Sequence, residues 1–294
     1  MQASLPSVSV CIPVYNRARL VAEALDSVLA QGYPRLEILV QDNASTDGTA
    51  AVLAQYAQAH PHIRVERNPA LISMSANYNA VLNRAQGEAV LPLSSDDLLE
   101  PGFLRTCADA LADPALDLVT TGYYWLEDGR KTRRIPKVRG GLYRGALRTI
   151  LLENPFNVNC TLFRRAALDR ARIGGKVLRE RLVTVDFDLW LRLAAAGCTM
   201  LYLDGLNGGS YRLHAGNVTK SNRTMYRHAG LTILANRAAL KAQCPLAYRY
   251  KLGRMLTHDL RDWLRGRPLD RHLTRAVRLA LLERQAVTAG CGSD

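Results

Sequence analysis

The chain has 294 residues, 48% of them apolar, and a formal net charge of +13 at pH 7. A chain of this length buries a substantial core, so it needs neither disulfides nor a structural metal to fold. Its six cysteines are scattered and form no Cys-x-x-Cys pair, which disfavours zinc sites and disulfide frameworks. No run reaches the ~18 apolar residues that cross a bilayer, and the first residues lack a signal-peptide pattern. We therefore expect a protein on the cytoplasmic side of the membrane.

The positive charge is concentrated towards the C-terminus. From Asn222 onward, fourteen Arg and Lys stand against five Asp and Glu, a net charge of +9. This excess predicts phosphate-rich partners or an anionic membrane surface. Nucleic acid is disfavoured as a partner, because aromatic residues make up only 6% of the chain and no recognition motif interleaves them with basic ones.

The first part of the chain alternates between two hydrophobic patterns. Short apolar runs predict buried strands, and apolar residues at helical spacing predict the helices between them, with Asn16 as a candidate N-cap of the first helix. The expected elements are a strand over 7–14, a helix through 29, a strand over 36–40, a helix over 45–59, a strand over 63–66, a helix over 75–84, a strand over 89–93 and a helix over 101–111. This alternation predicts an α/β, Rossmann-like fold, a mostly parallel sheet flanked by helices.

The pattern changes after about residue 117. A hairpin is expected to turn at Asp128-Gly129 and return along a basic arm, which is either a solvated sheet edge or a phosphate-binding arm. Strands are expected over 157–163, 199–203 and 210–213, and a helix with Asp186 as its N-cap.

Beyond residue 221 the pattern indicates basic amphipathic helices. We therefore predict two units, residues 1–221 and a basic helical C-terminal extension over 222–294. The helices of the extension either pack on the first unit or make a peripheral contact with an anionic membrane.

Two adjacent carboxylates, Asp96 and Asp97, follow the strand predicted over 89–93. Because ligands bind at the carboxyl ends of parallel strands, these carboxylates are candidate ligands of a divalent cation that carries phosphates. Neighbouring side chains of an extended segment point in opposite directions, so one is expected to hold metal and the other a ribose hydroxyl, a backbone amide or a basic side chain. A simple Asx turn is the alternative reading. Neither a Walker-type loop nor a Gly-x-Gly-x-x-Gly motif offers another phosphate site.

Several ordered motifs now carry a family resemblance. They are Val-Ser-Val-Cys-Ile-Pro-Val-Tyr-Asn-Arg, Val-Leu-Ala-Gln-Gly-Tyr-Pro, Leu-Glu-Ile-Leu-Val-Gln-Asp-Asn-Ala-Ser-Thr-Asp-Gly-Thr, Ser-Ser-Asp-Asp and Asp-Phe-Asp-Leu-Trp-Leu-Arg-Leu-Ala. Over roughly residues 7–221 the chain resembles the family 2 glycosyltransferases of the GT-A fold. The resemblance implies inverting transfer of a sugar from a nucleotide-diphosphate donor to a hydroxyl of a glycan or lipid-linked acceptor, with Mg²⁺ or Mn²⁺ as cofactor. It also implies a role in bacterial cell-surface polysaccharide or glycolipid synthesis.

The resemblance also implies roles for individual residues. Asp186 falls at the position of the general base, and the Ser-Ser-Asp-Asp segment corresponds to the Asp-x-Asp motif. The residues implied in donor binding are Pro13, Tyr15 and Asn16 around the base, Asp42 as acceptor of a hydrogen bond from the base, Asn77 and Asn79 on a helix facing the donor, and Asp96. Asp96, Asp97 and His214 are the implied metal ligands, although His214 could equally be a surface histidine after a short strand.

Two positions depart from the family pattern. Ser94 stands where many members have the first Asp of Asp-x-Asp, and Val185 where an acidic residue often precedes the base. Asp188 is an alternative base, but its spacing also suits an i,i+4 ion pair with Arg192. Because of Ser94 and the high positive charge, the rival hypothesis is a catalytically impaired protein of this fold that binds an anionic polymer or a membrane.

Overall fold

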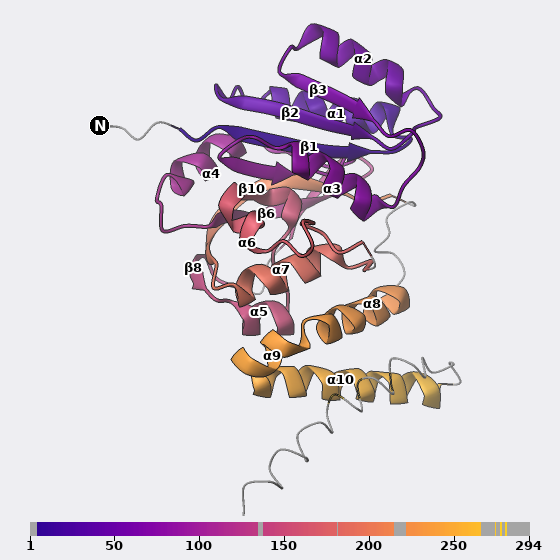
Figure 1. Ribbon diagram of the computed structural model, residues 1–294, viewed down its shortest axis with the longest axis vertical. Coiled ribbons are helices and arrows are strands. Elements are labelled where there is room, and N and C mark those ends of the chain that lie inside the picture. Colours follow the sequence, from indigo (N-terminus) through magenta and orange to yellow (C-terminus); the bar gives the residue numbers. More distant parts are fainter. Residues whose placement is uncertain are drawn as a thin grey trace, which may run out of the picture.

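The computed structural model describes residues 5–134, 138–180, 182–214 and 222–265, together with residues 274, 277 and 280. Within these residues the chain forms one sheet covered by helices on both faces (Figure 1). The strands are β1 (Val8–Val14), β2 (Leu36–Asp42), β3 (Ile63–Arg67), β4 (Ala89–Pro92), β5 (Leu98–Leu99), β6 (Leu118–Glu127), β7 (Arg130–Arg133), β8 (Gly141–Arg144), β9 (Thr161–Arg164) and β10 (Thr199–Arg212).

The sheet order is β3-β2-β1-β4-β9-β6-β10-β5, with β7 paired to β6 and β8 to β10. The first four of these strands are parallel, as their alternation with helices predicted, and β6 also runs parallel to β10. The other pairings are antiparallel, so the parallel arrangement is limited to these two parts of a mixed sheet. The hairpin between β6 and β7 turns at Asp128-Gly129, as predicted.

The helices divide between the two faces of the sheet. They are α1 (Ala18–Leu29), α2 (Thr49–Ala59), α3 (Met74–Arg84), α4 (Phe103–Leu111), α5 (Leu147–Leu152), the 3₁₀ helix η1 (Val158–Cys160), α6 (Arg165–Arg170), α7 (Val185–Ala195), α8 (Asn222–Ala235), α9 (Arg237–Gln243) and α10 (Pro245–Leu264). One apolar cluster joins the sheet to α1, α2 and α4, and a second joins it to α3, α5, α6 and α7. Along β1, Val8, Val10 and Ile12 face the first cluster and Cys11 the second, as the period-two alternation of a strand requires.

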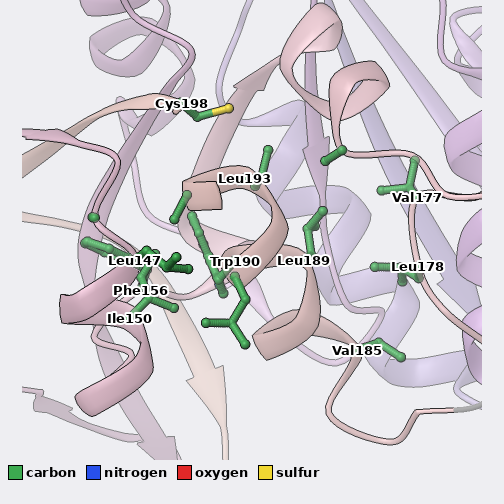
Figure 2. Packing of buried hydrophobic residues seen from close by; sticks show 14 of the residues in the cluster. Leu147, Ile150, Phe156, Val177, Leu178, Val185, Leu189, Trp190, Leu193 and Cys198 are labelled. Atoms are coloured by element: carbon green, nitrogen blue, oxygen red, sulfur yellow. The ribbon is translucent and has the colours of Figure 1, made fainter. Parts of the chain in front are cut away.

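The second cluster continues into the C-terminal helices. Trp190 of α7 is fully enclosed and packs against Phe156 and Phe163, with ring centroids 5.3 and 5.6 Å away (Figure 2). Ile233 of α8 and Leu252 of α10 are buried in the same cluster. Figure 1 shows α8, α9 and α10 at the end of the molecule opposite α2 and β3. Packing on the first unit, one of the two readings of these helices, is therefore what the described part of the extension does.

Several expected boundaries were wrong, each for a local reason. Asn16 is not the N-cap of α1, because Arg17 holds that position; Asn16, one residue earlier, has a left-handed backbone with φ 50°. Thr184 takes the N-cap position that Asp186 was expected to hold. The strand expected over 157–163 begins only at 161, because the Asn157 side chain accepts the Asn159 N–H at 2.9 Å and starts a 3₁₀ turn.

The helices expected over 45–59 and 101–111 begin at 49 and 103. The strands expected over 199–203 and 210–213 are one irregular strand, β10. Each described helix is too short or too polar to span a bilayer.

A buried ionic cluster ties α7 to its surroundings. The Asp188 carboxylate is fully buried and accepts hydrogen bonds from Arg192 Nε at 2.8 Å, Arg179 Nη1 at 3.0 Å and Asn236 Nδ2 at 2.7 Å. The first contact confirms the predicted i,i+4 pair. Arg192 also donates to the carbonyl oxygens of Ala171 and Val177. One carboxylate thus joins α7, the segment before it and the end of α8.

We predict that Asp188→Ala lowers the free energy of unfolding by about 3–5 kcal/mol, because it leaves the buried Arg192 guanidinium without its counter-charge. Urea denaturation followed by circular dichroism measures the change. Asp109→Ala is the matched control, since Asp109 forms an i,i+4 pair with Arg105 on the exposed surface of α4, worth about 1 kcal/mol or less. Equal losses in the two variants would contradict the assigned role of Asp188.

Candidate functional site

A pocket of about 760 Å³ opens at the carboxyl ends of β1 and β4. Among the described residues that line it are three aspartates, Asp96 and Asp97 after β4 and Asp186 on α7, and one arginine, Arg17. The other lining residues that matter below are Pro13, Tyr15, Asn43, Leu71, Ile72, Met74, Asn77, Tyr78, Ser94, Tyr123, Trp125, Asn154, Asn157, Asn159 and Tyr211. The edge of the sheet at which the sequence predicted a ligand is therefore hollow and carries charged groups.

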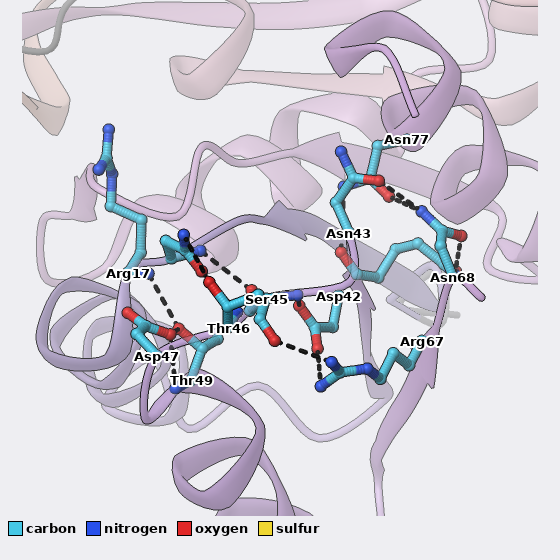
Figure 3. A network of polar contacts seen from close by, with 12 residues as sticks. Arg17, Asp42, Asn43, Ser45, Thr46, Asp47, Thr49, Arg67, Asn68 and Asn77 are labelled. Carbon is cyan, nitrogen blue, oxygen red and sulfur yellow. Dashed lines mark hydrogen bonds and ion pairs between the residues drawn. The ribbon is translucent and has the colours of Figure 1, made fainter. Parts of the chain in front are cut away.

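The loops after β1 and β2 are fastened to each other (Figure 3). The Asn16 backbone N–H donates to Ser45 Oγ at 3.0 Å, and the Asn16 side-chain oxygen accepts the Thr46 N–H at 2.8 Å. Asn16 does not line the pocket, whereas the neighbouring Pro13, Tyr15 and Arg17 do. Asn16 thus holds the turn that presents Tyr15 and Arg17, and its predicted contact with a base remains a prediction.

Asp42 lies beneath this turn and does not line the pocket. Its side chain is 1% exposed, and its two oxygens accept from the Ser45 N–H at 3.0 Å and from Arg67 Nη1 at 3.0 Å. Figure 3 shows both contacts. In this structure Asp42 anchors the loop that follows β2, and its predicted hydrogen bond to a base stays a prediction.

Helix α3 presents three consecutive polar residues to three different surroundings. Asn77 lines the pocket and bonds to Asn68 and to the Gln41 carbonyl, at 2.8 and 3.1 Å. Asn79 does not line it, because its amide pairs with both backbone groups of Leu178 at 2.8 Å. The sequence reasoning passed over Tyr78, which lines the pocket between them and bonds through its hydroxyl to Ser94 Oγ at 2.9 Å.

The paired carboxylates after β4 have different surroundings. Asp96 Oδ2 lies 2.8 Å from His214 Nε2, so the structure brings together two of the three predicted metal ligands. Asp97 is 2% exposed and accepts the Arg212 N–H at 2.8 Å and the Asn159 amide N–H. Burial and the neighbouring Asp96 raise the pKa of Asp97 well above its ordinary value. Asp97 therefore fulfils the expectation that one of the two would hold a backbone amide.

Asp186 opens onto the same pocket from the first turn of α7. Asp186 is exposed at the pocket by accessible surface, but the protein atoms around its carboxyl exclude part of the bulk water, and this desolvation raises its pKa above the ordinary 3.8. Asp188 is not a pocket residue, since its carboxylate is enclosed by the ionic cluster described above. Of the two candidate bases, only Asp186 can reach a bound molecule.

The donor set at the turn after β4 suits a small hard cation. Among the described residues there is no cluster of three or more His, Cys, Asp or Glu side chains that could enclose a metal. Mg²⁺ and Mn²⁺ sites that act on phosphates commonly use one or two protein ligands, and substrate oxygens and water supply the rest. Asp96 and His214, which share a hydrogen bond, are two side chains that could supply such ligands, whereas both Asp97 oxygens already accept hydrogen bonds.

The residues missed from the sequence are mainly Arg17, Tyr78 and the aromatic side chains of β6 and β10. Arg17 belongs to the Tyr-Asn-Arg run that carries the resemblance, so the run itself was an available signal. Tyr123, Trp125 and Tyr211 gave no such signal, because alternating aromatics on two strands are as typical of a core as of a site.

Known proteins resemble this chain in sequence and in fold. A protein of Bacillus subtilis that is named as a glycosyltransferase, EpsE, is 31% identical over 198 residues. The alignment covers 65% of this chain and 68% of EpsE. TuaG of the same organism, named for teichuronic acid biosynthesis, is 28% identical over 222 residues, which cover 74% of this chain and 83% of TuaG.

Among solved structures, the mannosyltransferase PcManGT of Pyrobaculum calidifontis, in complex with GDP-Man and Mn²⁺, aligns with a TM-score of 0.61 and 22% identity. The alignment covers 97% of this chain and 81% of that one. This likeness confirms the predicted fold.

The model of the family described as Glycosyl transferase family 2 matches residues 9–172. Because this match spans more than half of the chain, the protein belongs to the family 2 glycosyltransferases.

Proposed function

We propose that the protein transfers a sugar from a nucleotide-diphosphate donor to an acceptor hydroxyl with inversion at the anomeric carbon. The observation that carries the proposal is the presence in one pocket of two carboxylates on separate elements, Asp96 after β4 and Asp186 on α7. A single displacement with inversion needs one group to assist the leaving diphosphate and another to take the proton of the attacking hydroxyl. Two carboxylates on separate elements of one pocket match that division of roles.

We assign donor binding to the wall formed by the loops after β1, β2 and β3. Tyr15 offers an exposed ring there, and Asn77, whose amide is held by Asn68 and the Gln41 carbonyl, lines the same pocket. Arg17 supplies the positive charge that a diphosphate requires, and the described residues give its guanidinium no ion-pair partner. In Figure 3 the Arg17 side chain points away from the hydrogen-bonded network around it.

Asp96 and His214 would hold Mg²⁺ or Mn²⁺. Asp97 would fix the turn that carries Asp96, through its hydrogen bonds with Asn159 and the Arg212 N–H. When bound, the cation would neutralise charge on the departing diphosphate. The relative from Pyrobaculum calidifontis, captured with GDP-Man and Mn²⁺, supports this assignment. Ser94, at the place of a first carboxylate, contributes a hydroxyl bonded to Tyr78 and Asn159 instead of a metal ligand.

We assign Asp186 as the general base. Desolvation raises its pKa, which makes it a stronger proton acceptor than an aspartate in bulk water. The acceptor hydroxyl must then approach from the side of α7, and its proton passes to Asp186 as the new glycosidic bond forms.

We further propose that the product is a bacterial cell-surface polysaccharide or glycolipid, as the resemblance to TuaG suggests. A cytoplasmic location of the protein is supported by the cysteines, because those of the described residues are free thiols and four of them are buried in the core. A peripheral contact with an anionic membrane is supported by α10, where Leu246 and Tyr250 are 81% and 58% exposed beside the basic Arg249.

We expect Asp186→Asn to lower turnover by about 10²- to 10⁴-fold, because the variant has no group to accept the proton of the acceptor hydroxyl. Donor affinity, measured by the thermal shift that the nucleotide sugar causes, should change little. Turnover is measured as release of the nucleotide diphosphate, after a screen of UDP-, GDP- and dTDP-sugars with Mn²⁺ has identified the donor. Asp169→Asn, at an exposed position of α6, is the matched control. Normal turnover of Asp186→Asn would disprove the assignment of the base.

Asp186→Asn should also be more stable than the wild type at neutral pH. A raised folded-state pKa means that ionisation of Asp186 opposes folding, so its cost is absent below the unfolded-state pKa and complete above the folded-state pKa. The gap in unfolding free energy between variant and wild type should therefore shrink as the pH falls towards 3.8. Urea denaturation across that range tests the sign, and a variant less stable than wild type at neutral pH would contradict it.

Asp96→Ala and Asp97→Ala should separate ligand binding from folding. Asp96→Ala should remove the Mn²⁺-dependent thermal shift caused by the nucleotide diphosphate, with a small effect on stability. Asp97→Ala should lower the free energy of unfolding by about 1–3 kcal/mol, because it leaves two buried N–H donors unpaired. Loss of the Mn²⁺ effect in a folded Asp97→Ala variant but not in Asp96→Ala would reverse the two roles.

A further inference from the structure

The pocket has a second wall, on the other side of the Ser94–Asp97 turn from Tyr15 and Arg17. In the sheet, β1 and β2 lie on one side of β4, and β6 and β10 lie on the other. Tyr123 and Trp125 of β6 and Tyr211 of β10 line the pocket on this second side, and we call these three residues the aromatic wall. The proposed donor site uses none of them.

The rings of the aromatic wall form one packed group. Trp125 and Tyr211 are register partners on adjacent parallel strands, with ring centroids 5.3 Å apart and planes at 89°. Tyr123 packs on Trp125 with centroids 5.4 Å apart and planes at 76°. Edge-to-face contacts of this kind hold rings in fixed orientations. Trp125 and Tyr211 are partly exposed and line the pocket, so a bound molecule can contact their rings.

The segment between α5 and η1, residues 153–157, holds the aromatic wall in place. The Arg134 guanidinium lies over the Tyr123 ring, 5.1 Å from its centroid, and donates to the Pro155 carbonyl at 3.1 Å. That segment also brings the side-chain amides of Asn154 and Asn157 to the pocket. Their oxygens accept the backbone N–H groups of Phe156 and Asn159, which fixes both amides and leaves N–H donors at the pocket.

We infer that the aromatic wall and these two amides bind the sugar ring that carries the acceptor hydroxyl, so that the acceptor is a saccharide. This inference rests on the proposed function for the identity of the reaction. A pyranose has a C–H face that stacks on aromatic rings and hydroxyl groups at its edge that need hydrogen-bond partners. The second wall offers both chemistries side by side. A lipid chain would use the rings but leave the fixed amides unpaired, which costs binding energy.

The arrangement also suits the geometry of the reaction. A ring stacked on Trp125 lies on the opposite side of the Ser94–Asp97 turn from the donor wall, so the two substrates enter without overlapping. Asp186 lines the same pocket and can take the proton of a hydroxyl directed at the donor. Trp125 and Tyr211 are thus residues that decide acceptor specificity, and they take no part in proton transfer.

The test begins with saccharide binding in the absence of donor. The probes are tetrasaccharides of glucose, galactose, mannose and N-acetylglucosamine, and the readout is saturation-transfer NMR, which detects sugar C–H groups in contact with the protein. We expect binding of at least one probe, with the strongest transfer to the C–H face of a terminal ring. Trp125→Ala should weaken this binding about tenfold or more, and Trp125→Phe less, because a ring face is retained.

Tyr124→Ala provides the matched control. Tyr124 precedes Trp125 on β6 and, by strand alternation, lies on the other face, where Lys131 Nζ is 5.8 Å from its ring centroid. It does not line the pocket, so saccharide binding should be unchanged in Tyr124→Ala. With the donor found in the screen, transfer to the bound probe should show a higher acceptor KM in Trp125→Ala than in Tyr124→Ala.

The outcomes separate this inference from the proposed function. Equal saccharide binding in Trp125→Ala and wild type, or activity with a polyisoprenyl phosphate but with no saccharide, would overturn the inference while leaving sugar transfer intact. Saccharide binding that depends on Trp125 in a protein with no donor-induced thermal shift would support the aromatic wall and overturn the transferase. Binding of no probe by the wild type would overturn the saccharide assignment.

Discussion

The buried carboxylate of Asp188 holds α7 against the segment before it and the end of α8. A charge enclosed in the core requires partners from every side, and it receives them from Arg192, Arg179 and Asn236. These partners come from α7, the segment before it and the end of α8, so satisfying one charge aligns three parts of the chain. A hydrogen bond of 2.7 Å between the Thr184 and Thr232 hydroxyls also fixes the N-terminus of α7 against α8.

This constraint gives two nearby aspartates opposite fates. Asp188 faces inward, where its charge is neutralised by partners and serves architecture. Asp186, two residues earlier, faces another direction on the helix and opens onto the pocket, where desolvation raises its pKa. The fixed placement of α7 therefore presents a partly desolvated carboxyl group at a defined point of the pocket. Asp97 and Asp96 repeat this division on the turn after β4, one carboxylate supporting the backbone and the other reaching His214.

Much of the fold could be predicted from the sequence, because local rules govern it. A short apolar run marked β1, and Asp128-Gly129 marked the hairpin. The same rules failed where side chains replace backbone partners, as at Asn16 and Asn157, and where distant strands meet. For the site, family motifs pointed to Asp96, Asp186 and His214, which share or border one pocket. No local pattern could reveal that Asn236 would bond to Asp188 or that Tyr211 would pack on Trp125, since these contacts depend on tertiary packing.

The hydrogen bonds around Ser94 restrict how this sequence can diverge. The Ser94 hydroxyl bonds to Tyr78 and donates to the Asn159 side-chain oxygen, while the Asn159 amide nitrogen donates to Asp97. A carboxylate at position 94 would face that oxygen, acceptor against acceptor, and turning the Asn159 amide to relieve the clash would withdraw its N–H from Asp97. Residues 78, 94, 97 and 159 are consequently epistatic. An acidic residue at position 94 therefore needs a compensating change at position 159 or 97 to keep the hydrogen bonds of this turn satisfied.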